Sequence, residues 1–193
     1  EDGKFVNIYD NFEGDELEAV KKMQFLTTKP VIYAANVSET DLKNGNDYVN
    51  KVKEYAKTHN ADVVIISAAI EAELSQLDEA EAKDYLNELG VASSGIERMI
   101  KSVYHLLDLR TYITAGEKEV RAWTIHAGDT APKAAGVIHT DFERGFIRAE
   151  VVSYDDFVSS GSLNAAKEKG LVRLEGKDYV VQDGDIMHFR FNV

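Results

Sequence analysis

Two short apolar runs in the first half of the chain predict a pair of parallel strands. Residues 31–35 and 63–66 are almost continuous in hydrophobic side chains, a pattern typical of strands buried on both faces of a parallel sheet. Residues 47–58, between them, carry apolar side chains on one helical face: Val49, Val52, Tyr55 and Ala56. A strand, a helix and a second strand in this order predict an α/β unit of the doubly wound type.

Helical patterns flank this unit on both sides. A short helix is predicted over residues 16–25, and a helical run with exposed acidic residues extends over 70–89. Ser93 or Ser94 can cap a further helix over 95–107. The last helix carries one apolar stripe: Ile96, Met99, Ile100, Val103 and Leu107. The first half of the chain is therefore expected to form part of one α/β domain.

The second half of the chain changes to short alternating strands. Residues 111–114 and 119–125 flank a glycine-containing turn and predict a hairpin. A short helix follows over 131–138. Two further strands are predicted over 146–152 and 186–191, separated by a segment that we expect to form loops. This order predicts a small α+β roll as a second domain.

Alternation assigns the faces of the last two strands. The inward side chains are expected to be Ile147, Ala149, Val151, Met187, Phe189 and Phe191, and the outward ones Arg148, Glu150, His188 and Arg190. If these strands neighbour the hairpin, a basic and aromatic surface suited to RNA results, made of Arg121, Trp123, Arg148, His188 and Arg190. The alternative is a solvated sheet surface, on which these cations pair with Glu119, Glu143 and Glu150.

Composition narrows the classes of function. The formal net charge is −12 over 193 residues, which argues against DNA binding because phosphate-neutralising surfaces need clustered Lys and Arg. Cys is absent, which excludes disulfides, thiolate metal sites and Cys nucleophiles. The five His residues show no ligand spacing, so no metal site is expected. Asp183-Gly184-Asp185 lacks the further oxygen ligands of a cation loop and predicts a tight turn instead.

The chain carries no sequence signal for a membrane. No apolar stretch approaches the ~20 residues that a membrane-spanning helix needs, and the first residues lack the features of a signal peptide. We therefore expect a cytoplasmic protein.

Polar motifs follow both predicted parallel strands. Asn36-Val37-Ser38-Glu39 comes after the first strand, and Ser67-Ala68-Ala69 after the second. Ligands of open α/β sheets bind at these carboxyl ends. In P-loop GTPases the first motif reads Asn-Lys-x-Asp, and its Asp accepts hydrogen bonds from two guanine donors that adenine lacks. Glu39 and Val37 depart from that pattern and weaken the expected guanine contacts.

The same strand end has a simpler interpretation. Ser38 is followed three residues later by Asp41, a spacing that suits a helix cap. Ser67 can likewise be a turn that only ends a strand. The two motifs occupy matching positions after two buried strands, however, which favours a ligand site.

These motifs, the segment 110–116 (RTYITAG) and the stretch from Leu174 to Val193 resemble the YchF/Obg-like ATPase family over nearly the whole chain. The resemblance implies the C-terminal half of a P-loop (G-type) doubly wound nucleotide-binding domain, followed by an α+β ubiquitin-like β-grasp TGS domain. Residues 1–106 would be the partial OBG-type G domain, with the end of a helical insertion at 1–26. Residues 107–193 would be the TGS domain.

The resemblance also implies roles for the residues of the two motifs. Asn36 would bind the purine edge and brace the phosphate loop, and Val37 would pack beside the base. Glu39 would be the altered selectivity residue. Ser67 and the Ala68 backbone would line the far side of the base, with Ala69 where many GTPases have Lys.

The implied function is that of a ribosome-associated NTPase that binds and hydrolyses ATP, and GTP more weakly, with magnesium. Its expected partners are the ribosome (large subunit) or translation factors, with possible RNA contact through the TGS domain. The printed sequence contains no Gly-x-x-x-x-Gly-Lys-Ser/Thr loop and no Asp-x-x-Gly. We therefore expect this chain to be part of a longer parent, to hold no nucleotide tightly and to be inactive alone. The alternative is a non-catalytic TGS module that binds ribosomal RNA, tRNA or a protein.

Overall fold

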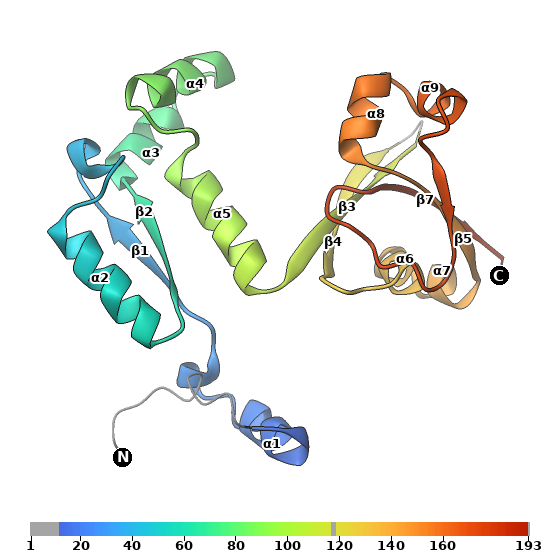
Figure 1. Cartoon of the computed structure of the whole chain (residues 1–193), viewed down its shortest axis with the longest axis horizontal. Coiled ribbons are helices and arrows are strands. Elements are labelled where there is room, and N and C mark those ends of the chain that lie inside the picture. The colour runs from blue at the N-terminus through green and yellow to red at the C-terminus, as the bar shows by residue number, and fades with distance from the viewer. Residues whose placement is uncertain (1–11, 117–118, 193) are drawn as a thin grey trace. The chain divides into compact units, whose positions relative to one another are not determined.

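The computed structural model describes residues 12–116 and 119–192, which divide into two compact units. The first unit ends at Leu106 and the second begins at Leu107 (Figure 1). Residues 1–11 of the implied helical insertion lie outside the described residues. In the described part of the chain, no helix is both long enough and apolar enough to span a membrane.

The first unit contains a two-stranded parallel sheet flanked by helices. Strands β1 and β2 pair in register from Ile32↔Asp62 to Asn36↔Ile66, so the predicted parallel pair is confirmed. Helices α2 and α5 contact both strands and lie on either side of the pair in Figure 1. The elements are α1 (Gly14–Met23), η2 (Leu26–Thr28), β1 (Ile32–Asn36), η3 (Glu39–Asp41), α2 (Asp47–Thr58), β2 (Asp62–Ile66), α3 (Ala68–Leu74), α4 (Glu79–Glu88) and α5 (Gly95–Leu106).

Local capping explains where several of these helices begin and end. Helix α2 matches its predicted range because Asn46 accepts hydrogen bonds from the backbone N–H groups of Tyr48 and Val49. Ser94 caps α5 by accepting from Glu97 N–H, as expected. Helix α1 begins two residues earlier than predicted and ends at Gln24, whose φ of 51° is left-handed.

Two expectations for the first unit are wrong. The single helical run over 70–89 is two helices, because Asp78 forms a capping box with Glu81 and starts α4 after a break. The strands were expected to be fully buried, but β1 has no buried residue and β2 has only Val64. The described sheet has only these two strands, so each strand keeps one edge without a neighbouring strand.

The second unit is built on a five-stranded mixed sheet in the order β4-β3-β7-β5-β6. Strands β3 and β4 form the predicted antiparallel hairpin, while β7 is parallel to β3 and antiparallel to β5. This is the predicted α+β arrangement. The elements are β3 (Leu109–Ala115), β4 (Val120–His126), α6 (Ala131–Ile138), α7 (Thr140–Arg144), β5 (Phe146–Val152), α8 (Tyr154–Ser160), α9 (Leu163–Glu168), β6 (Arg173–Glu175) and β7 (Ile186–Phe191).

Both faces of this sheet are covered by side chains. The larger core includes Tyr112, Ala135, Val151 and Phe189, and α6 contributes Ala131, Ala134 and Ala135 to it. A smaller core on the other face contains Val152, Ile186 and Ala166 of α9. Helices α8 and α9 and strand β6 lie in the segment that the sequence was expected to leave as loops. Ser153 and Ser162 cap these helices by accepting backbone hydrogen bonds.

The face assignments in β5 need two corrections. Ile147 was expected to point inward, but it is 55% exposed because the pairing with β7 shifts register between Phe146 and Arg148. Glu150 lies on the predicted outward face, yet it is buried by ion pairs with side chains from two other elements. Phe191 of β7, also expected inward, is 37% exposed and stacks on Phe142. Ala149, Val151, Met187 and Phe189 are buried in the larger core as expected.

A tight backbone approach at Gly145 gives a test of the second unit. A Cβ at Gly145 would overlap the carbonyl group of Asn192, whose N–H donates to Gly145 O at 2.9 Å. We expect Gly145→Ala to lower the free energy of unfolding by about 1–3 kcal/mol, because backbone must move to relieve the overlap. Gly176→Ala is the matched control, since a Cβ at Gly176 would meet no other atom within 4 Å and the substitution should change stability by less than about 0.5 kcal/mol.

The measurement is denaturant unfolding followed by tryptophan fluorescence. Trp123 is the sole tryptophan of the chain and lies in the second unit, so its signal reports the unit that contains both substitutions. Equal midpoints for the two variants would contradict the close approach.

Candidate nucleotide-base and RNA-contact sites

A hydrogen bond joins the carboxyl ends of the two parallel strands. The Ala68 N–H donates to Asn36 Oδ1 at 3.0 Å, and the Val37 N–H donates to Ile66 O at 2.8 Å. Because Asn36 and Ile66 are register partners, the residues that follow each strand meet at one edge of the sheet. The structure thus brings together both predicted motifs.

The loop that carries Glu39 is held by its own polar side chains. Ser38 Oγ donates to Asp41 Oδ2 at 3.2 Å, and Asn46 Nδ2 donates to the same oxygen at 2.8 Å. Asn46 also caps α2, so the loop is tied to the start of that helix. The Ser38 side chain does not cap the backbone of the short helix η3, contrary to the simpler interpretation of this segment. The loop therefore presents Glu39 from a defined turn.

The candidate base site is an open edge of the first unit. Ser67 is buried, at 1% exposure, and Val37 is half-buried. The remaining predicted base-site residues are exposed: Asn36, Glu39, Ala68 and Ala69. Such an edge can cover one side of a planar base and leaves the other side to residues beyond this edge.

Tyr85 of α4 lies among acidic side chains that include Glu39. Tyr85 donates to Glu73 Oε2 at 2.6 Å. This hydrogen bond, burial and the charges of Glu73, Glu39 and Glu88 together raise the pKa of Tyr85 to about 12. Glu39 is thus one of the carboxylates whose charge reaches Tyr85 of α4.

Sequence reasoning missed a set of contacts that fixes α5 against this site. Glu71 Oε1 accepts from the Gly95 N–H at 2.6 Å, and Arg98 donates to Ile65 O at 2.9 Å. A Cβ at Gly95 would lie 3.0 Å from Ile66 Cγ2, so a glycine fits this approach. These contacts join the end of β2 to the start of α5. The Gly after two Ser residues was the only local signal for them.

The five residues predicted to contact RNA do not share one face. Trp123 packs against the larger core, together with Met187 and Phe189. Because successive strand residues point to opposite faces, His188 and Arg190 lie on the face away from Trp123. Strand β3 also separates β4 from β7. The prediction of one surface made of all five residues is therefore wrong.

Arg121 and Trp123 form a pair of their own. The Arg121 guanidinium lies over the Trp123 ring, 4.1 Å from its centroid, and Trp123 Nε1 donates to Thr114 Oγ1 at 2.8 Å. The indole is thus held by a hydrogen bond on its edge and a cation on one face. The guanidinium occupies the position over that ring face that a stacked base would take.

Glu150 pairs with two cations on the sheet face opposite the larger core. Lys167 Nζ lies 2.8 Å from Glu150 Oε2, and Arg190 Nε donates to Glu150 Oε1 at 2.8 Å. The hydrogen bonds from Lys167 and Arg190 lower the pKa of Glu150 to about 2, although burial opposes this shift. Lys167 comes from α9, a helix that the sequence analysis did not predict, which is why it was missed.

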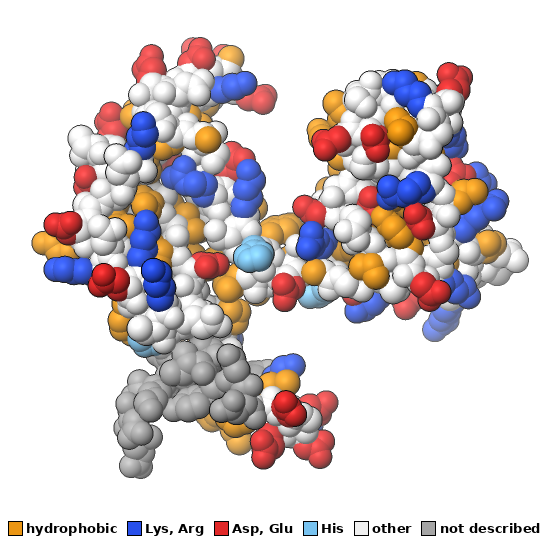
Figure 2. All heavy atoms as spheres, viewed as in Figure 1, with side chains coloured by type: hydrophobic (Ala, Val, Ile, Leu, Met, Phe, Trp, Pro, Cys, Tyr) orange, Lys and Arg blue, Asp and Glu red, His pale blue; other side chains and the backbone are white. Residues whose placement is uncertain are grey.

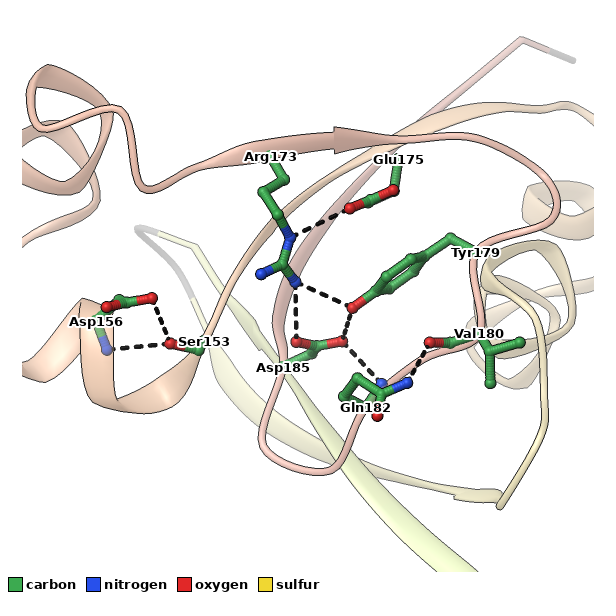
Figure 3. Close-up of polar contacts among 8 residues, drawn as sticks. All are labelled: Ser153, Asp156, Arg173, Glu175, Tyr179, Val180, Gln182 and Asp185. Atoms are coloured by element: carbon green, nitrogen blue, oxygen red, sulfur yellow. Dashed lines mark hydrogen bonds and ion pairs between the residues drawn. The ribbon is translucent and has the colours of Figure 1, made fainter.

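In the turn before the last strand, the carboxylates of Asp183 and Asp185 accept hydrogen bonds from other groups of the protein. Asp185 Oδ2 accepts from Tyr179 Oη at 2.7 Å and from the Gln182 N–H at 2.9 Å, and Arg173 donates to Tyr179 Oη (Figure 3). Burial, followed by the hydrogen bond to Asp185, raises the pKa of Tyr179 to about 12. Asp183 accepts from the Thr111 N–H at 2.7 Å. These contacts match the predicted tight turn, and the described residues contain no His, Cys, Asp and Glu cluster that could hold a metal.

Comparisons with known proteins match both units. Residues 109–192 match the family YchF-GTPase_C, described as "Protein of unknown function (DUF933)". The "Ribosome-binding ATPase YchF" of Haemophilus ducreyi is 58% identical over 93% of this chain and 49% of the relative. The human "Obg-like ATPase 1" is 43% identical over 98% of this chain and 48% of the relative. The chain spans about half the length of the curated relatives it matches.

A solved structure has the same fold. The Schizosaccharomyces pombe YchF GTPase gives a TM-score of 0.81 at 36% identity, covering 97% of this chain and 50% of that chain. The fold class is thus the C-terminal end of a G-type nucleotide-binding domain followed by a TGS-like mixed sheet. The chain belongs to the YchF/Obg-like ATPase family and corresponds to the C-terminal portion of its members.

The lowered pKa of Glu150 predicts an acid-sensitive second unit. Because the folded-state pKa lies below the ordinary value of 4.5, the ion pairs stabilise the fold above about pH 4.5 and lose that effect as pH falls toward 2. We expect Glu150→Gln to reduce the fall in unfolding free energy across this window. Glu168→Gln, an exposed acid on α9, is the control and should leave the pH dependence unchanged. Identical pH profiles for wild type and Glu150→Gln would refute the assignment.

Proposed function

We propose that this chain is the base-recognition half of an ATP-preferring P-loop NTPase that associates with ribosomes. The observation that carries the proposal is the hydrogen bond from Ala68 N–H to Asn36 Oδ1, which holds the Asn36 amide at the carboxyl ends of two parallel strands. The printed names of the relatives, a ribosome-binding ATPase and an Obg-like ATPase, support the same function.

Asn36 has the chemistry to recognise a purine. Its Oδ1 is engaged by Ala68, so its NH₂ group remains to donate to a ligand. Adenine and guanine both present N7 as an acceptor on the edge that also carries the six-position. Asn36 therefore recognises a purine without distinguishing adenine from guanine, and Ser67 with the Ala68 and Ala69 backbone lines the other side of the base.

Selectivity for ATP is assigned to Glu39 and Val37. An Asp in the Glu39 position would accept from guanine N1–H and the 2-amino group, whereas the longer Glu39 does not fit that geometry. Val37 stands where GTPases have a Lys, so the long side chain that lies along the base in those proteins is missing. The names of the relatives include both ATPase and GTPase, so selectivity needs a direct measurement.

Hydrolysis is assigned to a full-length parent that carries this sequence. Phosphoryl transfer needs a phosphate-binding loop and Mg²⁺, and the printed sequence has no such loop motif. Residues 1–106 would supply the end of the OBG-type G domain and residues 107–193 the TGS domain. The base edge at the strand ends fits the purine of ATP or GTP, while no described cluster fits Mg²⁺, and the chain alone would not turn over ATP.

The ribosome is the proposed partner of the second unit. Acidic and basic side chains are interspersed on the face of the second unit that Figure 2 shows, and we assign the ribosome contact to a local cluster of cations. A TGS module that binds RNA without catalysis is the second candidate function. The specific observation that favours it is the group of cations around Glu150.

The purine contact is tested by Asn36→Asp in the full-length parent. The substitution keeps an oxygen for the Ala68 N–H but replaces the NH₂ donors by an acceptor. We expect ATP and GTP affinities to fall together by about tenfold or more, because a lost hydrogen bond to a buried partner costs about 1–3 kcal/mol. Calorimetry provides the measurement. Asn50→Asp makes the same chemical change on the exposed face of α2 and should leave affinity unchanged; unaltered binding by Asn36→Asp would defeat the proposal.

Nucleotide preference is tested by restoring the guanine contacts. We expect the parent to bind ATP at least as tightly as GTP, and Val37→Lys with Glu39→Asp to move the ratio of affinities toward GTP. Glu54→Asp, which shortens an exposed acid on α2, serves as the control. A parent that binds GTP more than about tenfold more tightly than ATP would contradict this assignment, since that ratio corresponds to about 1.4 kcal/mol in the wrong direction.

A further inference from the structure

Four side chains form a block on the α9 face of the second unit's sheet. Glu150 of β5 is the register partner of His188 of β7, and Arg148 is the register partner of Arg190. All four lie on the face opposite the larger core, because Ala149, Val151, Met187 and Phe189 alternate with them and are buried there. Lys167 reaches this block from α9.

The block has an excess of positive charge held at a fixed place. Lys167 and Arg190 both bind the Glu150 carboxylate, whose side chain is only 9% exposed. The two cations remain 45% and 49% exposed, so solvent reaches their other donors. Arg148 lies two residues before Glu150 in β5 and opposite Arg190, so three cations share this face with one carboxylate. The shared carboxylate fixes two of them before any ligand arrives, which lowers the entropy cost of binding.

Sheet stability alone does not explain this arrangement. Like charges directly opposite each other on neighbouring strands are unfavourable, yet Arg148 faces Arg190. The Arg148 side chain makes no hydrogen bond or ion pair with any described residue. Arg190 uses Nε and one terminal nitrogen on Glu150, which leaves its other terminal nitrogen for a ligand. The alternative was a solvated sheet surface on which the cations pair with acidic residues. Among the described residues on this face of the sheet, only the ion pairs of Glu150 match it.

We propose that Arg148, Lys167 and Arg190, organised by Glu150, bind backbone phosphates of RNA, with His188 at the edge of the site. Guanidinium groups donate in pairs to phosphate oxygens, and the ammonium group adds a point charge. A site of this size neutralises a few phosphates and reads no sequence, which suits a locally basic face on a chain of net charge −12. The proposal rests on the proposed ribosome association and names the surface that makes the contact.

The test compares charge-matched variants in salt titrations. The full-length parent is sedimented with ribosomes, and the 193-residue chain is titrated with a labelled poly(U) oligonucleotide. Arg148→Gln removes a cation that has no described partner, so the fold should be kept. We expect Arg148→Gln to weaken both interactions roughly fivefold near 0.1 M salt and to lower the salt slope by about one. Lys167→Gln should add to the effect.

Arg121→Gln is the control, because it removes the same charge from the opposite face and should leave the slope unchanged. Equal affinities and slopes for wild type and Arg148→Gln overturn the proposal. A loss with ribosomes but not with poly(U) also overturns it, since it indicates an acidic protein partner. If the wild-type parent does not bind ribosomes, the proposed ribosome association fails, while the poly(U) titration still decides the phosphate site.

Discussion

The parallel pairing of β1 with β2 is the constraint on which the candidate base site depends. In-register pairing up to Asn36 and Ile66 places the next residues of both strands at one edge. The Asn36 side chain then closes the gap between them by accepting from Ala68 N–H. Neither motif alone defines a site, because each is a strand end with exposed polar groups. Joined, they place the Asn36 amide beside the backbone that follows β2, and the proposed base site rests on this arrangement.

In the second unit, the alternation of strand residues positions a group of charged side chains on one face of the sheet. Its central ladder, β5 with β7, buries apolar residues on both faces, and the polar residues of the α9 face occupy one end of it. Glu150 can be buried there because Lys167 and Arg190 neutralise it. The cost of removing a carboxylate from water is thereby offset by two ion pairs. The same arrangement leaves cations partly exposed at a fixed position.

Sequence patterns predicted the elements whose signals are local. Helix α2 and strand β7 have the expected ranges because caps, turns and periodicity all lie within a few residues of their ends. The Asp78–Glu81 capping box was also a local signal. Because it lies within a continuous acidic run, the pattern predicted one helix instead of two. The caps at Ser153 and Ser162 could have revealed α8 and α9 in the same way.

Other features depended on residues distant in the chain and could not be predicted. The register shift at Ile147 is set by pairing with β7, which begins 39 positions later in the sequence. The separation of Trp123 from Arg190 depends on strand order, because β3 lies between β4 and β7. Alternation placed Ala149, Val151, Met187 and Phe189 correctly and Ile147 wrongly, and it does not say which strands are neighbours or which faces coincide. The meeting of the two motifs at one edge was predictable because it depends on one parallel pair of strands.

The central claim is that Asn36 holds the purine at the joined strand ends. The most direct measurement is a crystal structure of the full-length parent with a non-hydrolysable ATP analogue. We expect the Asn36 amide nitrogen to lie within hydrogen-bond distance of purine N7, with Asn36 Oδ1 still accepting from Ala68 N–H. An adenine bound away from this edge, or an Asn36 side chain turned from the base, would contradict it.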